Sequence, residues 1–239
     1  MNQTITLLDD QHVVFPPVYQ ALSEPDGLLA VGGNLNVETL LSAYRQGIFP
    51  WFNDNDPILW WSPAPRMTFR PGQLHRGRSL RKLIRKHPYR ITFDHAFHQV
   101  IEACAETRPN SEGTWITTEM KAAYITMHRA GHAHSVEVWD GEQLVGGIYG
   151  LAIGRVFFGE SMFSRQSNTS KLALHALSDQ LALWGFVLMD CQVHNPHLES
   201  LGITLMPRKT FLEILDRYCP QEPSGAHWKQ DWQWNDHPS

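Results

Sequence analysis

The segment HSVEVWDGEQLVGGIYGLAIGRVFFGES, residues 134–161, constrains the fold more than any other part of the chain. Two turn signals, Asp140-Gly141 and Gly154, divide it into three runs rich in apolar and β-branched residues. An Asp-Gly pair between such runs is typical of a tight hairpin. The segment therefore predicts three strands in an antiparallel meander.

A helix and a buried strand are expected after the meander. Residues 167–185, SNTSKLALHALSDQLALWG, offer N-caps at 168–170, an apolar helical face and a stop at Gly185. The run FVLMDCQV, residues 186–193, predicts an apolar strand that ends in polar groups. A strand, a crossover helix and a second strand normally lie parallel in one sheet. The expected fold class is α/β (α+β) with a mixed, mostly antiparallel sheet.

The first sixty residues form a separate small unit in this interpretation. The turn-forming GGNLN leads into a helix near Val37–Gln46, and the aromatic-rich GIFPWF and ILWWSPAPR follow. The Pro-rich segment Pro63–Pro71 is the expected boundary, which gives a small N-terminal domain over 1–64 and a catalytic domain over 65–239. Two further helices are expected, over Asp94–Ala105 and Thr118–Ala130.

The charge distribution points to a polyanion, although the net charge is −4. Residues 66–90 hold nine of the twenty Lys and Arg residues, and no acid lies between Asp56 and Asp94. Within this basic stretch Leu80, Leu83 and Ile84 follow helical spacing, which predicts an amphipathic helix with an outward basic face. The cations expected to bind phosphates on that face are Arg78, Arg81, Lys82, Arg85 and Lys86.

Composition excludes several classes of protein. No run of about 18 apolar residues could span a bilayer, and the N-terminus lacks the pattern of a secretory signal, so a cytoplasmic protein with no membrane contact is expected. Cys104, Cys191 and Cys219 are too widely spaced for a zinc pair or a disulfide framework, so reduced thiols are expected.

Three polar residues are candidates for chemistry. Glu160 is a lone carboxylate in the aromatic stretch FFGESMFSR, and Asp190 and Gln192 share one face of the last predicted strand. If the two strands are neighbours, these groups converge where both strands end. The alternative is that Asp190 caps a turn that begins at HNPH. Cys191 faces the other way with no base beside it, which favours a structural thiol.

The histidines form two sequence clusters: His128, His132 and His134 in HRAGHAH, and His194 and His197 in HNPH. A zinc site on the first cluster needs a helix that holds His128 and His132, but Gly131 breaks that helix, so no metal is expected. GESMF also lacks the second glycine of a nucleophile elbow, which argues against Ser161 as a nucleophile.

The chain has nine tryptophans, and four of them are expected in loops: Trp51, Trp60, Trp61 and Trp115. Loop aromatics near a basic face are typical of binding to single-stranded nucleic-acid ends, where bases stack on rings and cations hold phosphates. The alternative is that these rings pack the two domains together.

The order of elements resembles the acyltransferase fold of the GNAT type, in which the acyl donor enters between splayed strands. A CoA donor needs a glycine-rich turn at the start of the helix after the meander. The segment SRQSNTSK holds no glycine there, which argues against CoA. Two rival functions are an N-acetyltransferase that uses acetyl-CoA and a non-enzymatic module that binds basic N-termini through Glu160 and Asp190.

Longer motifs resemble one bacterial family. GIFPWF, DPILWWSP, GTWIT, GHAHSVEVW, LVGGIYG, FGESMFSR and DCQV, within about Phe15 to Pro207, are together similar to leucyl/phenylalanyl-tRNA-protein transferases. The resemblance implies an N-terminal domain on a GNAT-like domain and no metal, CoA or other cofactor. It also implies transfer of Leu or Phe, with Met as a further donor residue, from aminoacyl-tRNA to proteins that begin with Arg or Lys. Such products enter N-end-rule degradation.

The resemblance also implies roles for individual residues, in a chain expected to act as a monomer. The residues for the terminal adenosine of tRNA are Trp51, Trp115, Tyr44 and Tyr124. The residues for the aminoacyl side chain are Ile148, Phe157, Leu174, Leu177 and Met189. Asp190 with Gln192 is expected to accept or relay the amine's proton, and Glu160 to select the acceptor's cation. The reverse division is open, as is proton transfer to a ribose hydroxyl, with Asp190 only positioning the amine.

Overall fold

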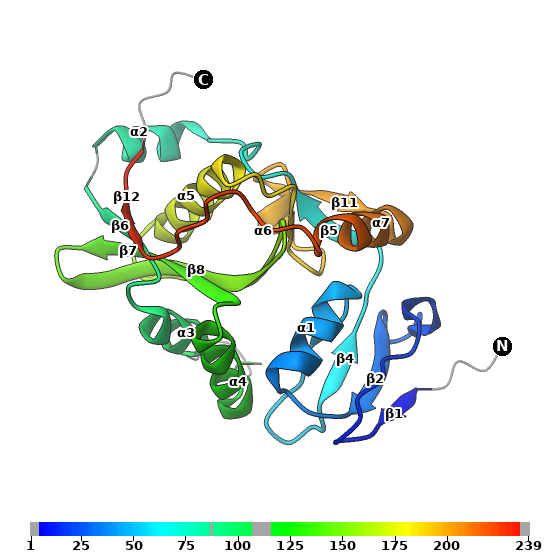
Figure 1. Ribbon diagram of the computed structural model, residues 1–239. Helices are drawn as coiled ribbons and strands as arrows, with labels where there is room; N and C mark the ends of the chain where they lie inside the picture. The colour runs from blue at the N-terminus through cyan, green and yellow to red at the C-terminus, as the bar shows by residue number, and fades with distance from the viewer. Residues whose placement is uncertain (1–4, 87, 107–115, 235–239) are drawn as a thin grey trace.

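Two β-sheets, each with its own helices, build the molecule (Figure 1). The computed structural model describes residues 5–86, 88–106 and 116–234. Within these segments a small sheet has the order β1-β2-β4-β3 and a large sheet the order β11-β5-β10-β9-β8-β7-β6-β12. Both sheets contain parallel and antiparallel pairs, so the expected mixed α/β class is confirmed.

The small sheet lies in the N-terminal part of the chain. Its strands are β1 (Thr6–Leu8), β2 (Leu28–Gly32), β3 (Phe49–Pro50) and β4 (Leu59–Trp61). Helix α1 (Val37–Arg45) begins where the Asn36 side chain accepts a hydrogen bond from the Thr39 backbone N–H, so the predicted helix is confirmed. The strands were not predicted, because two to five residues are too few for a clear alternation.

The large sheet holds the predicted meander. Its strands are β5 (Arg66–Phe69), β6 (Arg90–Phe93), β7 (Ala133–Asp140), β8 (Gln143–Ile153), β9 (Val156–Ser164), β10 (Leu188–Asp190), β11 (Thr204–Met206) and β12 (Gln230–Trp232). Strands β7, β8 and β9 pair antiparallel in sequence, as predicted. Gly141 and Gly154 both have φ +57°, in the left-handed region that favours glycine.

The predicted crossover is also present. Strand β9, helix α5 (Thr169–Leu183) and strand β10 form a parallel unit in which Asp190 pairs with Phe158. Strand β10 is shorter than the predicted run of residues 186–193. It ends because Gln192 adopts φ +57° and turns the chain away from the sheet.

The segment Pro63–Pro71, expected to be a boundary, contains β5 instead. All four residues of β5 are buried, and the strand lies between β10 and β11. The prolines lie outside this strand, because β5 has only four residues, Arg66–Phe69. The division at residues 64 and 65 stays a prediction; β4 of the small sheet ends at Trp61, and β5 of the large sheet begins at Arg66.

Helices cover both faces of the large sheet. The remaining helices are η1 (Val18–Gln20), α2 (Arg78–Lys86), α3 (Phe97–Ala105), α4 (Thr118–Arg129), α6 (Pro196–Glu199) and α7 (Arg208–Tyr218). Helix α5, with α2 against it, lies on one face, and α3 and α4 lie on the other (Figure 1). Helix α3 begins later than predicted because Asp94 has φ +54°.

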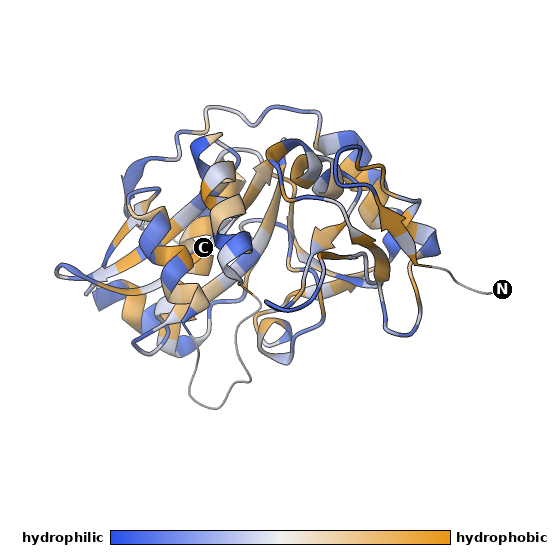
Figure 2. Cartoon of the chain, turned by 90° about the horizontal axis from the view of Figure 1, so that it is seen from below, coloured by the Kyte–Doolittle hydropathy of each residue, from blue (hydrophilic) through white to orange (hydrophobic). Residues whose placement is uncertain are grey.

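The sheet therefore separates two hydrophobic cores. One lies under α5 and includes Leu172 and Leu181; the other joins α1 of the small unit to α3 and α4 through Tyr44, Phe97 and Tyr124. Figure 2 shows hydrophobic strands in both sheets and helices with hydrophilic and hydrophobic sides. Across the described part of the chain, no helix is long and apolar enough to span a membrane.

Candidate active site

A cavity of ≈ 420 Å³ lies where the two units meet. Ile148 of β8, Leu174 of α5 and Met189 of β10 give it an apolar wall. Glu160 and Gln192 are at its polar side. The other residues used below that line it are Phe49, Trp51, Ser161, Cys191 and Asn195. An apolar cavity with a few polar groups is the usual form of a ligand site.

Glu160 reaches this cavity through a β-bulge. Tyr149 of β8 pairs with Ser161, and Gly150 pairs with Gly159, so Glu160 is the extra residue on β9. A Cβ at Gly150 would lie 2.1 Å from the Phe158 carbonyl oxygen, so only glycine fits beside the bulge. The sequence predicts a strand end here, and the structure instead places Glu160 within β9.

The Glu160 carboxyl makes three short polar contacts. Its Oε1 atom lies 2.7 Å from Tyr44 Oη and 3.0 Å from Gln192 Nε2, and its Oε2 atom lies 2.9 Å from Tyr124 Oη. The two phenol oxygens are 2.5 Å apart. Burial raises the pKa of Glu160 to about 7; the hydrogen bonds from the tyrosines oppose this rise, and the nearby Asp190 charge adds to it.

Asp190 has a different set of partners. Its side chain is fully buried and receives three hydrogen bonds from Arg66, from Nε to Oδ1 at 3.0 Å and to Oδ2 at 3.3 Å, and from Nη2 to Oδ2 at 2.9 Å. Oδ1 also accepts the backbone N–H of Gln192 at 3.0 Å. Asp190 therefore holds the turn directly after β10, at Gln192, and it also belongs to a buried ion pair. A cap on the turn that begins at HNPH stays a prediction.

Of the three predicted polar residues, Glu160 and Gln192 contact each other through their side chains, and Asp190 does not contact Glu160 in this way. The Gln192 side chain bonds Glu160, whereas the Asp190 side chain bonds Arg66. Because β10 ends at Asp190, Asp190 and Gln192 do not share one strand face. Asp190 is linked to the other two through the Gln192 backbone N–H and through the effect of its charge on the pKa of Glu160. Desolvation raises the pKa of the Cys191 thiol, with a smaller effect of Asp190, which agrees with an unreactive thiol.

Arg66 is the residue that sequence reasoning missed. It is 1% exposed, its Nη1 atom donates to the Gly47 carbonyl, and its guanidinium lies over the Phe49 and Phe211 rings. A signal was present: a lone cation begins the apolar run RMTF, and a lone acid ends the apolar run FVLMD. Buried charges of opposite sign tend to pair.

The predicted binding residues are only partly gathered at the cavity. Ile148, Leu174 and Met189 line it, whereas Phe157 and Leu177 are buried in the core under α5. Trp51 lines the cavity and is 43% exposed. Tyr44 and Tyr124 are fully buried, with their hydroxyls on Glu160. Trp115 lies outside the described residues.

Two tryptophans expected in loops are in a strand. Trp60 and Trp61 belong to β4, where they pair with β2 and β3. Trp60 is fully buried, donates from Nε1 to the Gly32 carbonyl and packs edge-on against Phe15. Trp60 is therefore a core residue of the small unit, whereas Trp61 is only partly buried.

The basic face of α2 is confirmed as an exposed surface. All five of its predicted cations are exposed, and none makes a salt bridge to another residue of the described segments: Arg78, Arg81, Lys82, Arg85 and Lys86. Leu80 is buried against α5, as the amphipathic pattern predicts. Arg66 does not belong to this face. Arg76 forms a salt bridge with Asp179.

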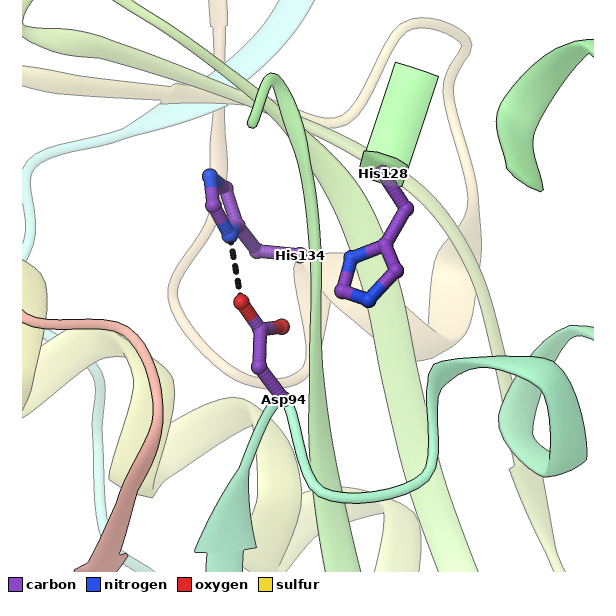
Figure 3. A group of neighbouring side chains, drawn as sticks. All are labelled: Asp94, His128 and His134. Atoms are coloured by element: carbon purple, nitrogen blue, oxygen red, sulfur yellow. Dashed lines mark hydrogen bonds and ion pairs between the residues drawn. The ribbon is translucent and has the colours of Figure 1, made fainter. Parts of the chain in front are cut away.

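One group in the described segments has the composition of a metal site. Potential ligand atoms of Asp94, His128 and His134 lie within 4.8 Å of one another (Figure 3). The group is already hydrogen-bonded: His134 Nδ1 lies 2.6 Å from Asp94 Oδ2, and His128 Nδ1 lies 2.7 Å from the Ala133 carbonyl. A cation would have to displace the bond between His134 and Asp94. His132 is not part of the group, and the absence of a metal stays a prediction.

The fold and the site fit a protein that binds an apolar group beside a polyanion. The cavity is apolar at one end and polar at the other, and an exposed basic helix offers a surface for phosphates. Comparison with known families makes this assignment specific. The family model "Leucyl/phenylalanyl-tRNA protein transferase" matches residues 68–216, and the model of its N-terminal domain matches residues 33–64. The chain belongs to this family of aminoacyltransferases.

Curated relatives agree with this membership. A leucyl/phenylalanyl-tRNA–protein transferase of Pseudomonas syringae pv. syringae is 54% identical over 224 residues, which cover 94% of this chain and 97% of the relative. The relative from Ectopseudomonas mendocina is 55% identical, and the match covers 94% of this chain and 99% of the relative. One from Saccharophagus degradans is 48% identical, with 96% of each chain covered.

Proposed function

We propose that this chain moves Leu or Phe, and Met less readily, from aminoacyl-tRNA to proteins that begin with Arg or Lys. The observation that carries the proposal is the ≈ 420 Å³ cavity, whose apolar wall ends at Glu160 and Gln192. The wall suits an apolar aminoacyl group, and the carboxyl suits a cationic acceptor. Addition of Leu or Phe would mark the acceptor for N-end-rule degradation.

The donor side chain is held by apolar contacts alone. Ile148, Leu174 and Met189 offer no hydrogen-bonding group from their side chains. One methylene in such a pocket changes binding by only about 1 to 3 kcal/mol. Leu and Phe should therefore both be accepted, whereas polar aminoacyl groups should be rejected because their hydrogen bonds to water would not be replaced.

The rest of the donor is held outside the cavity. The exposed cations of α2 are suited to acceptor-stem phosphates, and such contacts do not read sequence. Trp51 offers a stacking surface for the terminal adenosine at the cavity. In this proposal the reaction takes place in the cytosol, and the chain acts as a monomer.

The enzyme mainly has to orient two reactants, because the aminoacyl ester is already activated. Orientation alone contributes roughly 7 to 11 kcal/mol in favourable cases. Glu160 is the carboxyl that can meet the acceptor's cation, since it reaches the cavity whereas Asp190 is paired with Arg66. Asp190, bound by Arg66, positions the turn that carries Gln192. The sequence left open that Asp190 positions the amine itself; in this proposal it positions the turn instead.

The test is transfer of radiolabelled Phe from Phe-tRNA to a peptide that begins with Arg. A peptide that begins with Ala but is otherwise identical, and acetyl-CoA as an alternative donor, serve as controls. Label on the Arg peptide alone establishes the donor, the acceptor rule and the reaction. No label with intact Phe-tRNA and folded protein would contradict the proposed function.

A further inference from the structure

Three oxygen atoms at the polar end of the cavity form a closed triangle. Tyr44 Oη and Tyr124 Oη are 2.5 Å apart, Tyr44 Oη is 2.7 Å from Glu160 Oε1, and Tyr124 Oη is 2.9 Å from Glu160 Oε2. Each distance is that of an O–H···O hydrogen bond. Each such bond needs one hydrogen, so the triangle needs three.

The two phenols supply only two of these hydrogens. If both donated to an ionised Glu160, the two phenol oxygens would face each other at 2.5 Å with no hydrogen between them. Loss of a phenol proton makes the shortage worse. Burial and the Glu160 carboxyl raise the pKa of both phenols well above its ordinary value, so both stay protonated.

A hydrogen on Glu160 completes the triangle. Tyr44 then donates to Oε1, Oε2–H donates to Tyr124, and Tyr124 donates to Tyr44. Gln192 Nε2 donates to Oε1 as well, which is the oxygen left without a proton. All four contacts are satisfied with every group neutral, whereas an ionised carboxylate leaves one contact without a hydrogen.

We propose that the resting protein holds Glu160 as a neutral carboxylic acid closed in this ring, and that the cationic first residue of an acceptor expels its proton. The second half rests on the proposed function; the first half does not. The step balances: the acid and the cation give a carboxylate paired with the cation, and the proton leaves to solvent. Glu160 is thus a proton-gated cation site.

The side chains that surround Glu160 in the described residues are neutral or negative, which favours a neutral Glu160. Helices α1 and α4 contribute the neutral phenols Tyr44 and Tyr124, and β8 contributes Tyr149, whose pKa is raised by burial and by Glu160. Strand β10 contributes Asp190, a negative charge whose cation, Arg66, is turned toward it. Within the described residues Glu160 has no salt-bridge partner, so an acceptor would bring the first cation.

The first measurement reads the protonation state of Glu160 directly. Protein with ¹³C-labelled glutamate side chains is titrated by NMR, and Glu160→Gln identifies the Glu160 carboxyl signal by its loss. Glutamine keeps the ring's shape, because its oxygen can accept from Tyr44 and its amide can donate to Tyr124. We expect a neutral carboxyl at pH 6 that ionises near pH 7. A Glu160 signal already ionised at pH 6 overturns the proposal.

The second measurement tests the gate at pH 6. We expect the peptide that begins with Arg to convert the Glu160 signal to the ionised form and the matched Ala peptide to leave it neutral. A neutral signal that persists with the Arg peptide saturating overturns the gate. Both measurements are independent of aminoacyl transfer, so a failed transfer assay and a failed proton assignment are told apart.

Discussion

The two carboxyls beside the cavity lie on neighbouring parallel strands, and their surroundings are opposite. Asp190 is fully buried, with Arg66 bonded to both of its oxygens. Glu160 is partly exposed to the cavity, with two phenols and an amide around it and no cation. The same functional group is paired with a cation in one case, whereas in the other burial raises the pKa of the carboxyl. In the proposed function Asp190 therefore anchors the turn and Glu160 meets the acceptor.

The largest effect is expected from breaking the anchored pair. Arg66→Met leaves Asp190 as an unpaired buried charge and should lower the free energy of unfolding by about 3 to 5 kcal/mol. Urea denaturation measures it. The double variant with Asp190→Asn should recover part of this loss, because the unpaired charge is removed. A loss below about 1 kcal/mol in the single variant would show that the pair is not a structural anchor.

Asp190→Asn also tests the positioning role. An amide can still accept the Gln192 N–H but loses the ion pair with Arg66, so we expect the transfer rate to fall at least about tenfold. Steady-state transfer to the Arg peptide measures this fall, at a temperature where the variant is folded. An unchanged rate would remove Asp190 from the site.

The second carboxyl predicts a pH dependence of stability with the opposite sign to an ordinary salt-bridged acid. Folding raises the pKa of Glu160 from 4.5 to about 7, so the folded state holds more protons between these values. Stability due to Glu160 therefore falls as pH rises through this window. Glu160→Gln should remove the fall and gain up to ~3 kcal/mol relative to the native chain between pH 4.5 and pH 8. A constant difference across this range would contradict the raised pKa.

A smaller effect is expected on the basic face of α2. Charge reversal at Arg78, Arg81 and Arg85 should raise the apparent KM for aminoacyl-tRNA about tenfold or more, and its salt dependence should flatten as phosphate contacts are lost. Reversal at the exposed Arg129 and Lys209, on α4 and α7, is the control and should change neither. Equal effects of both sets would mean that only overall charge matters.

The smallest effect is expected in the apolar wall. Met189→Leu keeps the side chain close to its volume, so the preference between Leu-tRNA and Phe-tRNA should change by less than about tenfold. Competition between the two donors in one reaction measures the ratio. Loss of both activities with an intact fold would show that Met189 does more than shape the pocket.

Much of the fold could be predicted from local patterns. The meander β7-β8-β9 follows from apolar runs with glycine turns, and α5 follows from its leucine spacing. The strands that were not predicted are the four of the small sheet and β5, β6, β11 and β12 of the large sheet, and each has only two to five residues. An alternation of apolar and polar residues can be recognised only over a longer run. These short strands form because neighbouring strands supply their hydrogen-bond partners.

The sequence by itself determined the meander, the crossover, the basic face of α2 and the identities of Glu160, Asp190 and Gln192. These depend on residue type and spacing over a few turns or strands, where the physics is local. Only the tertiary structure decided which acid is paired with a cation and which is not. Arg66 and Asp190 are 124 positions apart, and Tyr44 and Glu160 are 116 apart, so the ion pair and the raised pKa of Glu160 depend on partners that the fold alone brings together.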